Sequence, residues 1–248
     1  MMDVILPDLS VWEWTTIVLA AIGAGLMRGF SGFGSALLLA PVLSLAVGPR
    51  VAVPAIVLAN IVPTIQMIPE AARVVAWRGV MPMGIAGAIG VPVGIWMLLH
   101  MDQAFMRRFI AVGVIAFALI MLFGWRFRGR PSRAFGVAMG WIGGFLSGAG
   151  SIGGPPVILF LLSGPDPAAV NRAILVHYFM WSQVAALVLF AAAGSIDWLV
   201  TWIAVVLLLP QIVGTWAGSR LFRKSSERLY RNVALAFLLA AGGSALVL

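Results

Sequence analysis

The chain has 248 residues, of which 62% are hydrophobic and only 10% are charged, and its formal net charge is +8. Because about a quarter of the residues in soluble domains are charged, this composition excludes an ordinary soluble protein and indicates a polytopic membrane protein. The chain has no cysteine, which excludes disulfides, thiolate metal sites and cysteine nucleophiles. We expect no metal and no cofactor. We also expect no nucleic acid partner, because the basic residues lie in short loops between apolar segments.

In chain order, the first element is a helix that follows an acidic start. Residues 1–14 contain Asp3, Asp8 and Glu13 but no lysine or arginine, so they lack the basic start of a cleavable signal peptide. We therefore expect this first helix to stay in the mature protein. Six further apolar stretches approach the roughly 20 residues that cross a bilayer core. They are residues 51–68, 79–99, 109–125, 173–193, 198–218 and 229–248.

A break rich in glycine and serine interrupts the apolar sequence once in each half. Residues 29–35 read Gly-Phe-Ser-Gly-Phe-Gly-Ser, and residues 144–151 read Gly-Phe-Leu-Ser-Gly-Ala-Gly-Ser. In lipid, irregular backbone survives only where it is buried in protein or lines a cavity. Paired, glycine-interrupted segments are typical of transporters with a substrate site near the bilayer midplane.

The two halves align as a sequence repeat. Phe30 and Phe145 lie 115 residues apart, whereas the later pair Gly90 and Gly214 lies 124 residues apart, which indicates an insertion in the second half. We expect a single transmembrane domain in which the first repeat is 1–128 and the second repeat is 129–248.

The loops differ in their basic charge. The loops near 73–78, 126–133, 172 and 220–231 hold 12 of the 16 lysines and arginines, whereas those near 50, 100–108 and 194–197 hold three. The positive-inside rule places the first group in the cytoplasm and the second group outside. Equivalent loops of the two halves then face opposite sides, so the repeats are predicted to be inverted.

The segments that follow the breaks are too short to cross a membrane. Residues 36–47 would form a helix of about 18 Å, and 155–163 is shorter still, against a hydrocarbon core of about 30 Å. The predicted fold is therefore an all-α polytopic membrane protein with two inverted repeats. Each repeat has three spanning helices plus a Gly-broken helical hairpin.

These features resemble the TauE/SafE family of sulfite and organosulfonate exporters, also called 4-TMS sulfite/anion transporters. The resemblance covers the whole chain and rests on two similar halves and on a glycine-rich motif followed by proline in each, at 29–41 and 144–156. The second motif is the more similar, because Ala36-Leu37-Leu38 replaces the expected glycines in the first. The resemblance implies export of sulfite or an organosulfonate by alternating access across the bacterial cytoplasmic (inner) membrane. The expected partners are this anion, the lipid bilayer and, as a candidate, a second copy of the chain in a homodimer.

The broken motifs form the candidate substrate site. Glycines let backbone N–H groups approach an anion closely, and helix N-termini and serine hydroxyls favour negative charge. The residues expected to bind substrate are Arg28, Phe30, Ser31, Gly32, Gly34, Ser35, Asn60, Ser147, Gly148, Gly150, Ser151, Gly153, His177, Ser182 and Gln183. The alternative for such glycines is close helix packing, which we expect for Gly90, Gly94, Gly214 and Gly218.

Two of these residues carry an open alternative. Arg28 either lines a polar cavity or extends to the cytoplasmic interface, because a charge near the bilayer centre is costly. His177 either couples protons to transport or is an interfacial histidine, since it lies only five residues from Arg172.

Two other functional classes are open from the sequence. Gly29-Phe30-Ser31-Gly32 resembles the Gly-x-Ser-Gly of rhomboid intramembrane proteases, but His177 lacks the glycine-spaced context of their histidine, so we expect no enzyme. An anion channel would use the same cavity, and saturation and counterflow would distinguish a carrier from it.

Overall fold

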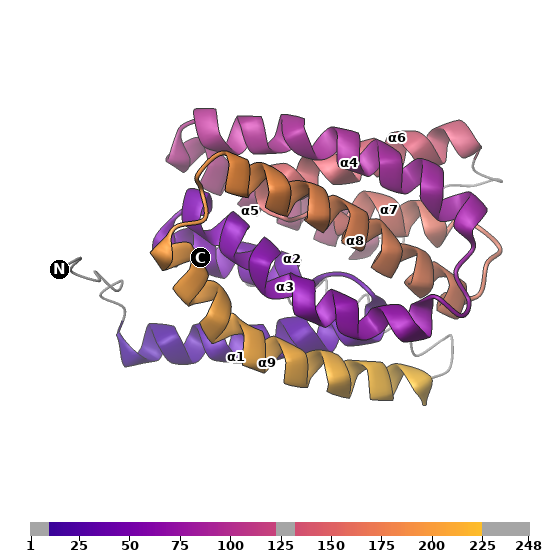
Figure 1. Ribbon diagram of the computed structural model, residues 1–248, viewed down its shortest axis with the longest axis horizontal. Helices are drawn as coiled ribbons and strands as arrows, with labels where there is room; N and C mark the ends of the chain where they lie inside the picture. Colours follow the sequence, from indigo (N-terminus) through magenta and orange to yellow (C-terminus); the bar gives the residue numbers. More distant parts are fainter. Residues whose placement is uncertain (1–9, 123–131, 225–248) are drawn as a thin grey trace.

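The structure is a computed structural model that describes residues 10–122 and 132–224. These residues form nine α-helices and no strand (Figure 1). The first half contains α1 (Val11–Ser31), α2 (Ser35–Val47), α3 (Pro49–Ala71), α4 (Trp77–His100) and α5 (Gln103–Leu122). The second contains α6 (Arg133–Gly150), α7 (Gly154–Leu161), α8 (Ala168–Ala192) and α9 (Trp198–Arg223). Within these ranges, five helices are long and apolar enough to cross a membrane: α1, α3, α4, α8 and α9.

The predicted spans coincide with helices whose ends differ from the prediction. The stretches 51–68, 79–99, 173–193 and 198–218 correspond to α3, α4, α8 and α9. The stretch 109–125 falls on α5, which begins earlier because the carboxylate of Asp102 accepts N–H bonds from Ala104 and Phe105 at 2.8 and 3.1 Å and so caps the first turn. The predicted span 229–248 lies outside the described residues.

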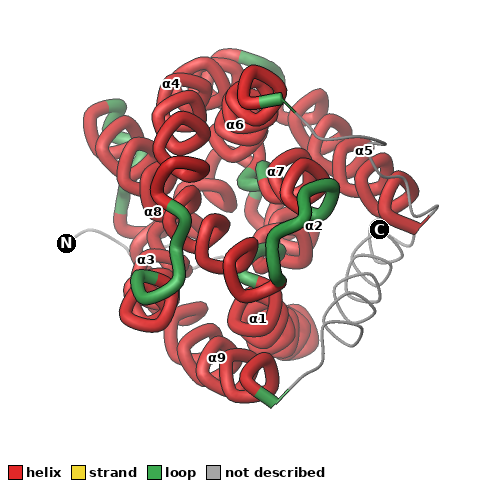
Figure 2. Tube along the Cα trace, turned by 90° about the vertical axis from the view of Figure 1, so that its right-hand side faces the viewer, coloured by secondary structure: helices red, strands yellow, loops and turns green. Residues whose placement is uncertain are grey.

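Two pairs of glycine-packed helices form the outer layers of the molecule. In Figures 1 and 2 the α4–α6 pair lies along the top and the α1–α9 pair along the bottom, with the other helices between them. Gly25 and Gly29 of α1 lie against the backbone of Gln211 and Thr215 of α9, in that order. The contacts advance in the same direction along both helices, so α1 and α9 are parallel.

The α4–α6 pair repeats this arrangement. Gly90 of α4 lies against the backbone of Trp141 on α6, and Gly144 of α6 lies against that of Gly87 on α4. A Cβ atom at these positions would collide with the facing backbone, so only glycine allows the helices this close. The expectation that Gly90, Gly94, Gly214 and Gly218 serve packing is confirmed.

Both predicted breaks interrupt the helices. Between α1 and α2, Gly32 and Gly34 have φ angles of +84° and +92°, which glycine adopts without steric cost. Between α6 and α7, Ser151 has a φ of +59°. The returning helices α2 and α7 have 13 and 8 residues, or about 20 and 12 Å, so neither can cross a hydrocarbon core of about 30 Å.

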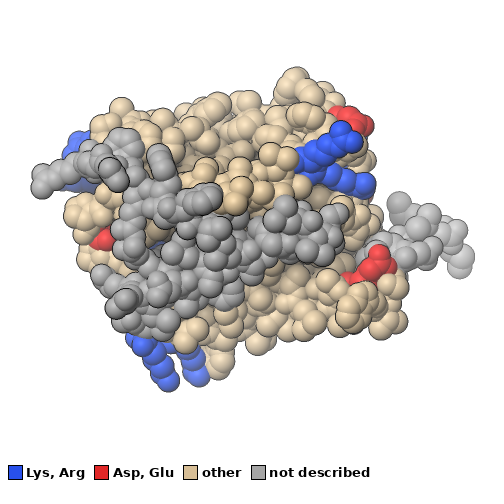
Figure 3. All heavy atoms as spheres, turned by 180° about the vertical axis from the view of Figure 1, so that it is seen from behind, with Lys and Arg blue, Asp and Glu red and all other residues tan. Residues whose placement is uncertain are grey.

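The charged residues collect at two ends of the molecule. At one end Arg172 of α8 pairs with Glu70 near the end of α3, and at the other Arg50 of α3 donates to the carbonyl of Met101. Seen from behind, lysine and arginine atoms lie at the ends, and the flank between them is uncharged where it is described (Figure 3). The first end carries Arg73, Arg78, Arg133, Arg172 and Arg223, and the second carries Arg50 and Arg107. These are the two loop groups that the charge bias separated.

Candidate functional site

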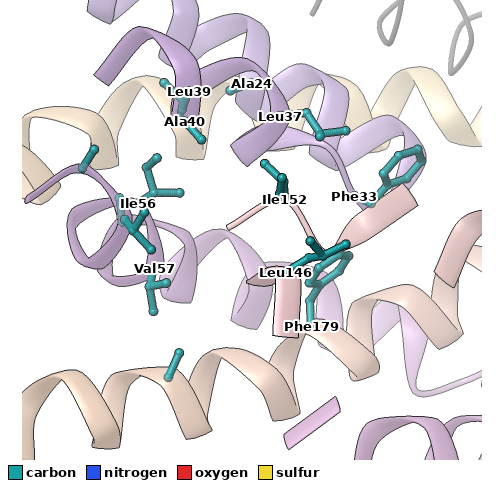
Figure 4. Close-up of a cluster of buried hydrophobic side chains, with 14 of the residues drawn as sticks. Ala24, Phe33, Leu37, Leu39, Ala40, Ile56, Val57, Leu146, Ile152 and Phe179 are labelled. Atoms are coloured by element: carbon teal, nitrogen blue, oxygen red, sulfur yellow. The ribbon is translucent and has the colours of Figure 1, made fainter. Parts of the chain in front are cut away.

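The tips of the two broken hairpins meet inside the protein. A Cβ atom on Gly154, at the start of α7, would lie 3.0 Å from the ring of Phe33 in the first break and 3.5 Å from that of Phe179 on α8. In Figure 4, Phe33 and Leu37 of the first hairpin face Leu146 and Ile152 of the second, with Phe179 beside them. Both interruptions of the helical backbone therefore lie in one buried region. This fits the rule that irregular backbone at membrane depth must be buried in protein or line a cavity, because lipid offers no hydrogen-bond partners.

A cavity opens at this meeting point. It is lined by residues of α1, α2, α3, α6, α7 and α8: Arg28, Gly34, Ser35, Ala36, Leu37, Val57, Asn60, Ser147, Ser151, Gly154, Phe179, Ser182, Gln183 and Ala186. The space open to the centre of a water-sized sphere is about 30 Å³, which is room for about two water molecules. The cavity is thus small, and its lining combines apolar side chains with the polar groups of Arg28, Asn60, Gln183 and several serines.

Arg28 supplies the positive charge of the cavity. Only 3% of the residue is exposed. Its Nη1 donates to Ser35 Oγ at 3.2 Å and its Nη2 donates to Thr64 Oγ1, while Nε has no hydrogen-bond partner among the described residues. The guanidinium also lies 5.6 Å from the centre of the Phe179 ring. Arg28 therefore points into the protein, and the interfacial alternative is wrong.

Amide groups hold the partners of Arg28. Ser35 Oγ donates to Asn60 Oδ1 at 2.9 Å, and Thr64 Oγ1 lies 2.8 Å from Gln183 Oε1. The amide oxygen of Asn60 thus accepts from Ser35. The one hydroxyl proton of Thr64 is shared between the backbone carbonyl of Asn60, at 2.6 Å, and Gln183 Oε1, and both hydroxyl oxygens accept from Arg28. A charged donor fixed in this way is ready for an anion without further rearrangement.

The second hairpin contributes two hydroxyl groups. Ser147 Oγ and Ser151 Oγ are buried and have no hydrogen-bond partner among the described residues. Most buried polar side-chain atoms in proteins are paired, so such atoms call for an explanation. Both serines line the cavity with Arg28, and a bound ligand with oxygen acceptors would satisfy both of them.

The two hairpins differ in the backbone donors they offer. At the start of α2, the N–H groups of Ser35 and Ala36 belong to the first helical turn, which has no intrahelical acceptors. At the start of α7, Pro155 and Pro156 occupy that turn, and proline has no N–H. Backbone recognition of an anion therefore favours the first hairpin, whereas the second contributes its hydroxyls.

The chain matches the family model of the sulfite exporter TauE/SafE over residues 17–245. It belongs to the TauE/SafE family. Members of this family are membrane exporters and not enzymes, so the rhomboid-like alternative is excluded. Neither a curated protein nor a solved structure matches the chain.

In this TauE/SafE protein the cavity gathers many of the expected substrate-binding residues. It includes Arg28, Gly34, Ser35, Asn60, Ser147, Ser151, Ser182 and Gln183. Ser182 differs from Ser147 and Ser151 because its hydroxyl donates to the carbonyl of Tyr178 at 2.9 Å, so it already has an acceptor within α8.

Other expected residues lie outside this lining. Phe30 packs edge-on against Phe222, 6.1 Å between ring centres, and Ser31 donates to the carbonyl of Met27 at 2.7 Å. His177 contacts the carbonyl of Ala173 and the ring of Trp77, between α8 and α4. These side chains are engaged in helix packing and local hydrogen bonds.

Four expected glycines also pack against protein. The neighbours that a Cβ atom would meet are Arg172 for Gly32, Val91 for Gly148, Ile110 for Gly150, and Gly143 with Ser147 for Gly153. Gly148 in particular belongs to the α4–α6 contact, so its role matches the packing alternative.

The sequence argument missed Thr64 and Phe179, which hold Arg28 from α3 and α8. Thr64 lies one helical turn after Asn60, on the same face of α3, and this i, i+4 spacing was a usable signal. Nothing in the sequence alone distinguishes Phe179 from the many other aromatic residues of the chain.

Proposed function

We propose that the chain exports a small oxyanion, sulfite or a small sulfonate, by alternating access around the Arg28 cavity. The observation that carries this proposal is the coincidence, in one small cavity, of a buried guanidinium with the hydroxyls of Ser147 and Ser151, which have no hydrogen-bond partner in the described part of the chain. An oxyanion offers a negative charge to Arg28 and separate oxygen acceptors to each serine.

The two halves act as inverted repeats that rock around this cavity. In support, the first helix of each half packs parallel to the fourth helix of the other half, α1 with α9 and α6 with α4. The helices that lead into the two hairpins also run in opposite directions. Gly29, near the C-terminal end of α1, lies at the Arg172 end of the molecule, whereas α6 begins at that end with Arg133. Such reciprocal packing is what a two-fold relation in the membrane plane produces.

Export follows from the membrane potential. With the Arg172 end in the cytoplasm of a bacterial inner membrane, moving a monovalent anion outward releases about 2.3 kcal/mol per 100 mV of inside-negative potential. Proton coupling is therefore not required, in keeping with the position of His177 outside the cavity lining. A channel is the alternative outcome: counterflow of labelled sulfite in proteoliposomes identifies a carrier, and its absence during fast, non-saturating flux identifies a channel.

The test of the site compares two serines whose hydroxyl groups are both buried and have no hydrogen-bond partner among the described residues. Ser147→Ala removes a buried, unpartnered hydroxyl from the cavity, and Ser44→Ala removes a buried, unpartnered hydroxyl elsewhere. Thermal stabilisation of the purified protein by sulfite is expected to weaken in Ser147→Ala and to persist in Ser44→Ala. Equal stabilisation in both variants would place anion binding elsewhere.

A further inference from the structure

A second polar hollow lies at the Arg172 end, outside the central cavity. It measures about 430 Å³ and is lined by residues of α3 and α9, among them Glu70, Arg73, Ser219 and Arg223. We name it the vestibule. Two arginines and one glutamate give its wall an excess of positive charge, which raises the local concentration of anions.

Arg172 lies beneath the wall of the vestibule. Only 3% of the residue is exposed. Its Nη2 donates to Ser219 Oγ at 3.0 Å, and its Nη1 lies 3.3 Å from the carboxylate of Glu70. Both of these partners line the vestibule, whereas Arg172 itself lies behind them and is covered by them.

The same guanidinium is also anchored to α1. Its Nε and Nη2 donate to the carbonyl of Gly29 at 3.1 and 2.7 Å, and Gly29 is the neighbour of Arg28 in α1. The ring of Phe222 also lies 4.5 Å from its guanidinium carbon. Arg172 thus has a fixed orientation where α8 meets α1, α3 and α9, and its Nη1 contacts a carboxylate.

That carboxylate is the exchangeable partner. The side chain of Glu70 is 37% exposed, whereas that of Arg172 is 3% exposed. A carboxylate oxygen and a sulfite or sulfonate oxygen present the same kind of acceptor to a guanidinium. An ion pair with one solvent-exposed member is weak, so an incoming anion competes with it readily.

We propose that the vestibule is a second anion-binding site, at which a small oxyanion replaces Glu70 on Nη1 of Arg172. Replacement breaks an ion pair between α3 and α8 at this end, because Glu70 belongs to α3 and Arg172 to α8. The apolar cluster of Met67, Ala71, Ala173 and Val176 still joins the two helices, so the anion weakens this contact without separating them. This inference rests on the proposed function, because the cavity is the destination of the anion.

The test removes the competitor of the anion. In the full-length purified protein, with sulfite as the probe, Glu70→Gln is expected to tighten binding by about two- to fivefold, the change expected for loss of one partly exposed ion pair. Asp166→Asn is the matched control, because it removes an exposed acidic charge outside the vestibule lining. Arg223→Gln is expected to weaken sulfite binding, and it keeps the test decisive if Glu70→Gln fails to fold.

The outcomes separate this inference from the proposed function. If Glu70→Gln binds sulfite as Asp166→Asn does, or Arg223→Gln leaves binding unchanged, there is no vestibule site. In that case a loss of binding in Ser147→Ala would still support the central cavity. If Glu70→Gln tightens binding while Ser147→Ala has no effect, the vestibule binds the anion and the central cavity does not.

Discussion

Arg28 of α1 donates a hydrogen bond to Thr64 of α3, 36 residues further along the chain, and both side chains are buried. Thr64 in turn lies 2.8 Å from the amide oxygen of Gln183 on α8. A single cation is thus held from two helices that do not belong to its own hairpin. Any movement of the first hairpin against α3 and α8 must break these bonds. In the proposed function, an anion bound at Arg28 compensates for their loss.

Arg28 variants should separate charge from geometry. Arg28→Gln removes the charge and is expected to weaken sulfite binding by about ten- to a hundredfold, the range for loss of a charged hydrogen bond. Arg28→Lys keeps the charge but loses the planar fork that reaches two acceptors at once, so its loss should be smaller. Isothermal titration of the purified proteins measures both changes. Unchanged affinity in Arg28→Gln would remove this residue from the site.

Gly148 should behave as a packing residue. A Cβ atom there would meet the backbone of Val91 and Ile95 on α4, so Gly148→Ala is expected to destabilise the folded protein by about 1–3 kcal/mol, as overpacking does. Gly79→Ala is the control, because its Cβ would meet only the Ile174 side chain at 3.7 Å. The melting temperature without ligand measures the effect. A Gly148→Ala protein that melts normally but no longer binds sulfite would return this residue to the substrate site.

The cavity should discriminate against a zwitterionic substrate that carries an ammonium group. Among the described residues that line it there is no aspartate or glutamate, and Arg28 is the charged group. An ammonium group would be buried without a counter-ion and beside a guanidinium, which is costly. We expect 2-hydroxyethanesulfonate to stabilise the protein against heat more than taurine, its analogue with an ammonium group in place of the hydroxyl. Stronger stabilisation by taurine would contradict the proposed charge balance.

Topology can be measured directly, because the chain contains no cysteine. Single cysteines in place of Arg78 and Lys224 should react with a membrane-impermeant maleimide only after the membrane is opened. Cysteines in place of Gln103 and Ser195 should react in intact cells. Labelling of all four positions from one side would contradict the inverted arrangement of the two halves.

The breaks in the helices were predictable from sequence, because clustered glycine and serine in an apolar chain have few other uses. The role of each glycine was not. Gly34 lines the cavity and Gly148 packs against α4, although both occur in the same kind of motif. Glycine permits close approach of a ligand and of a helix equally well, so the pattern cannot distinguish them.

Arg172 shows a second limit of the sequence. The uneven distribution of basic residues assigned Arg172 to the more basic end, which is where it lies. It is not a loop residue, however, because it belongs to α8 and is buried. Its partners, Gly29 and Ser219, lie 143 and 47 residues away along the chain. Contacts at such separations depend on how the helices assemble, and hydrophobic periodicity within one segment contains no information about them.

The pairing of α1 with α9 has a consequence for biogenesis. The hydrogen bond from Thr215 to the carbonyl of Gly25 joins residues 190 positions apart. At a synthesis rate of about 5–20 residues per second, α1 waits roughly 10–40 s in the membrane for its partner. During that interval the glycine face of α1 lacks the helix that covers it in the finished protein, whereas Thr64, a partner of Arg28, follows only 36 residues later. Until the ribosome has produced α9, either the insertion machinery or transient contacts with α2 to α8 must cover the glycine face of α1.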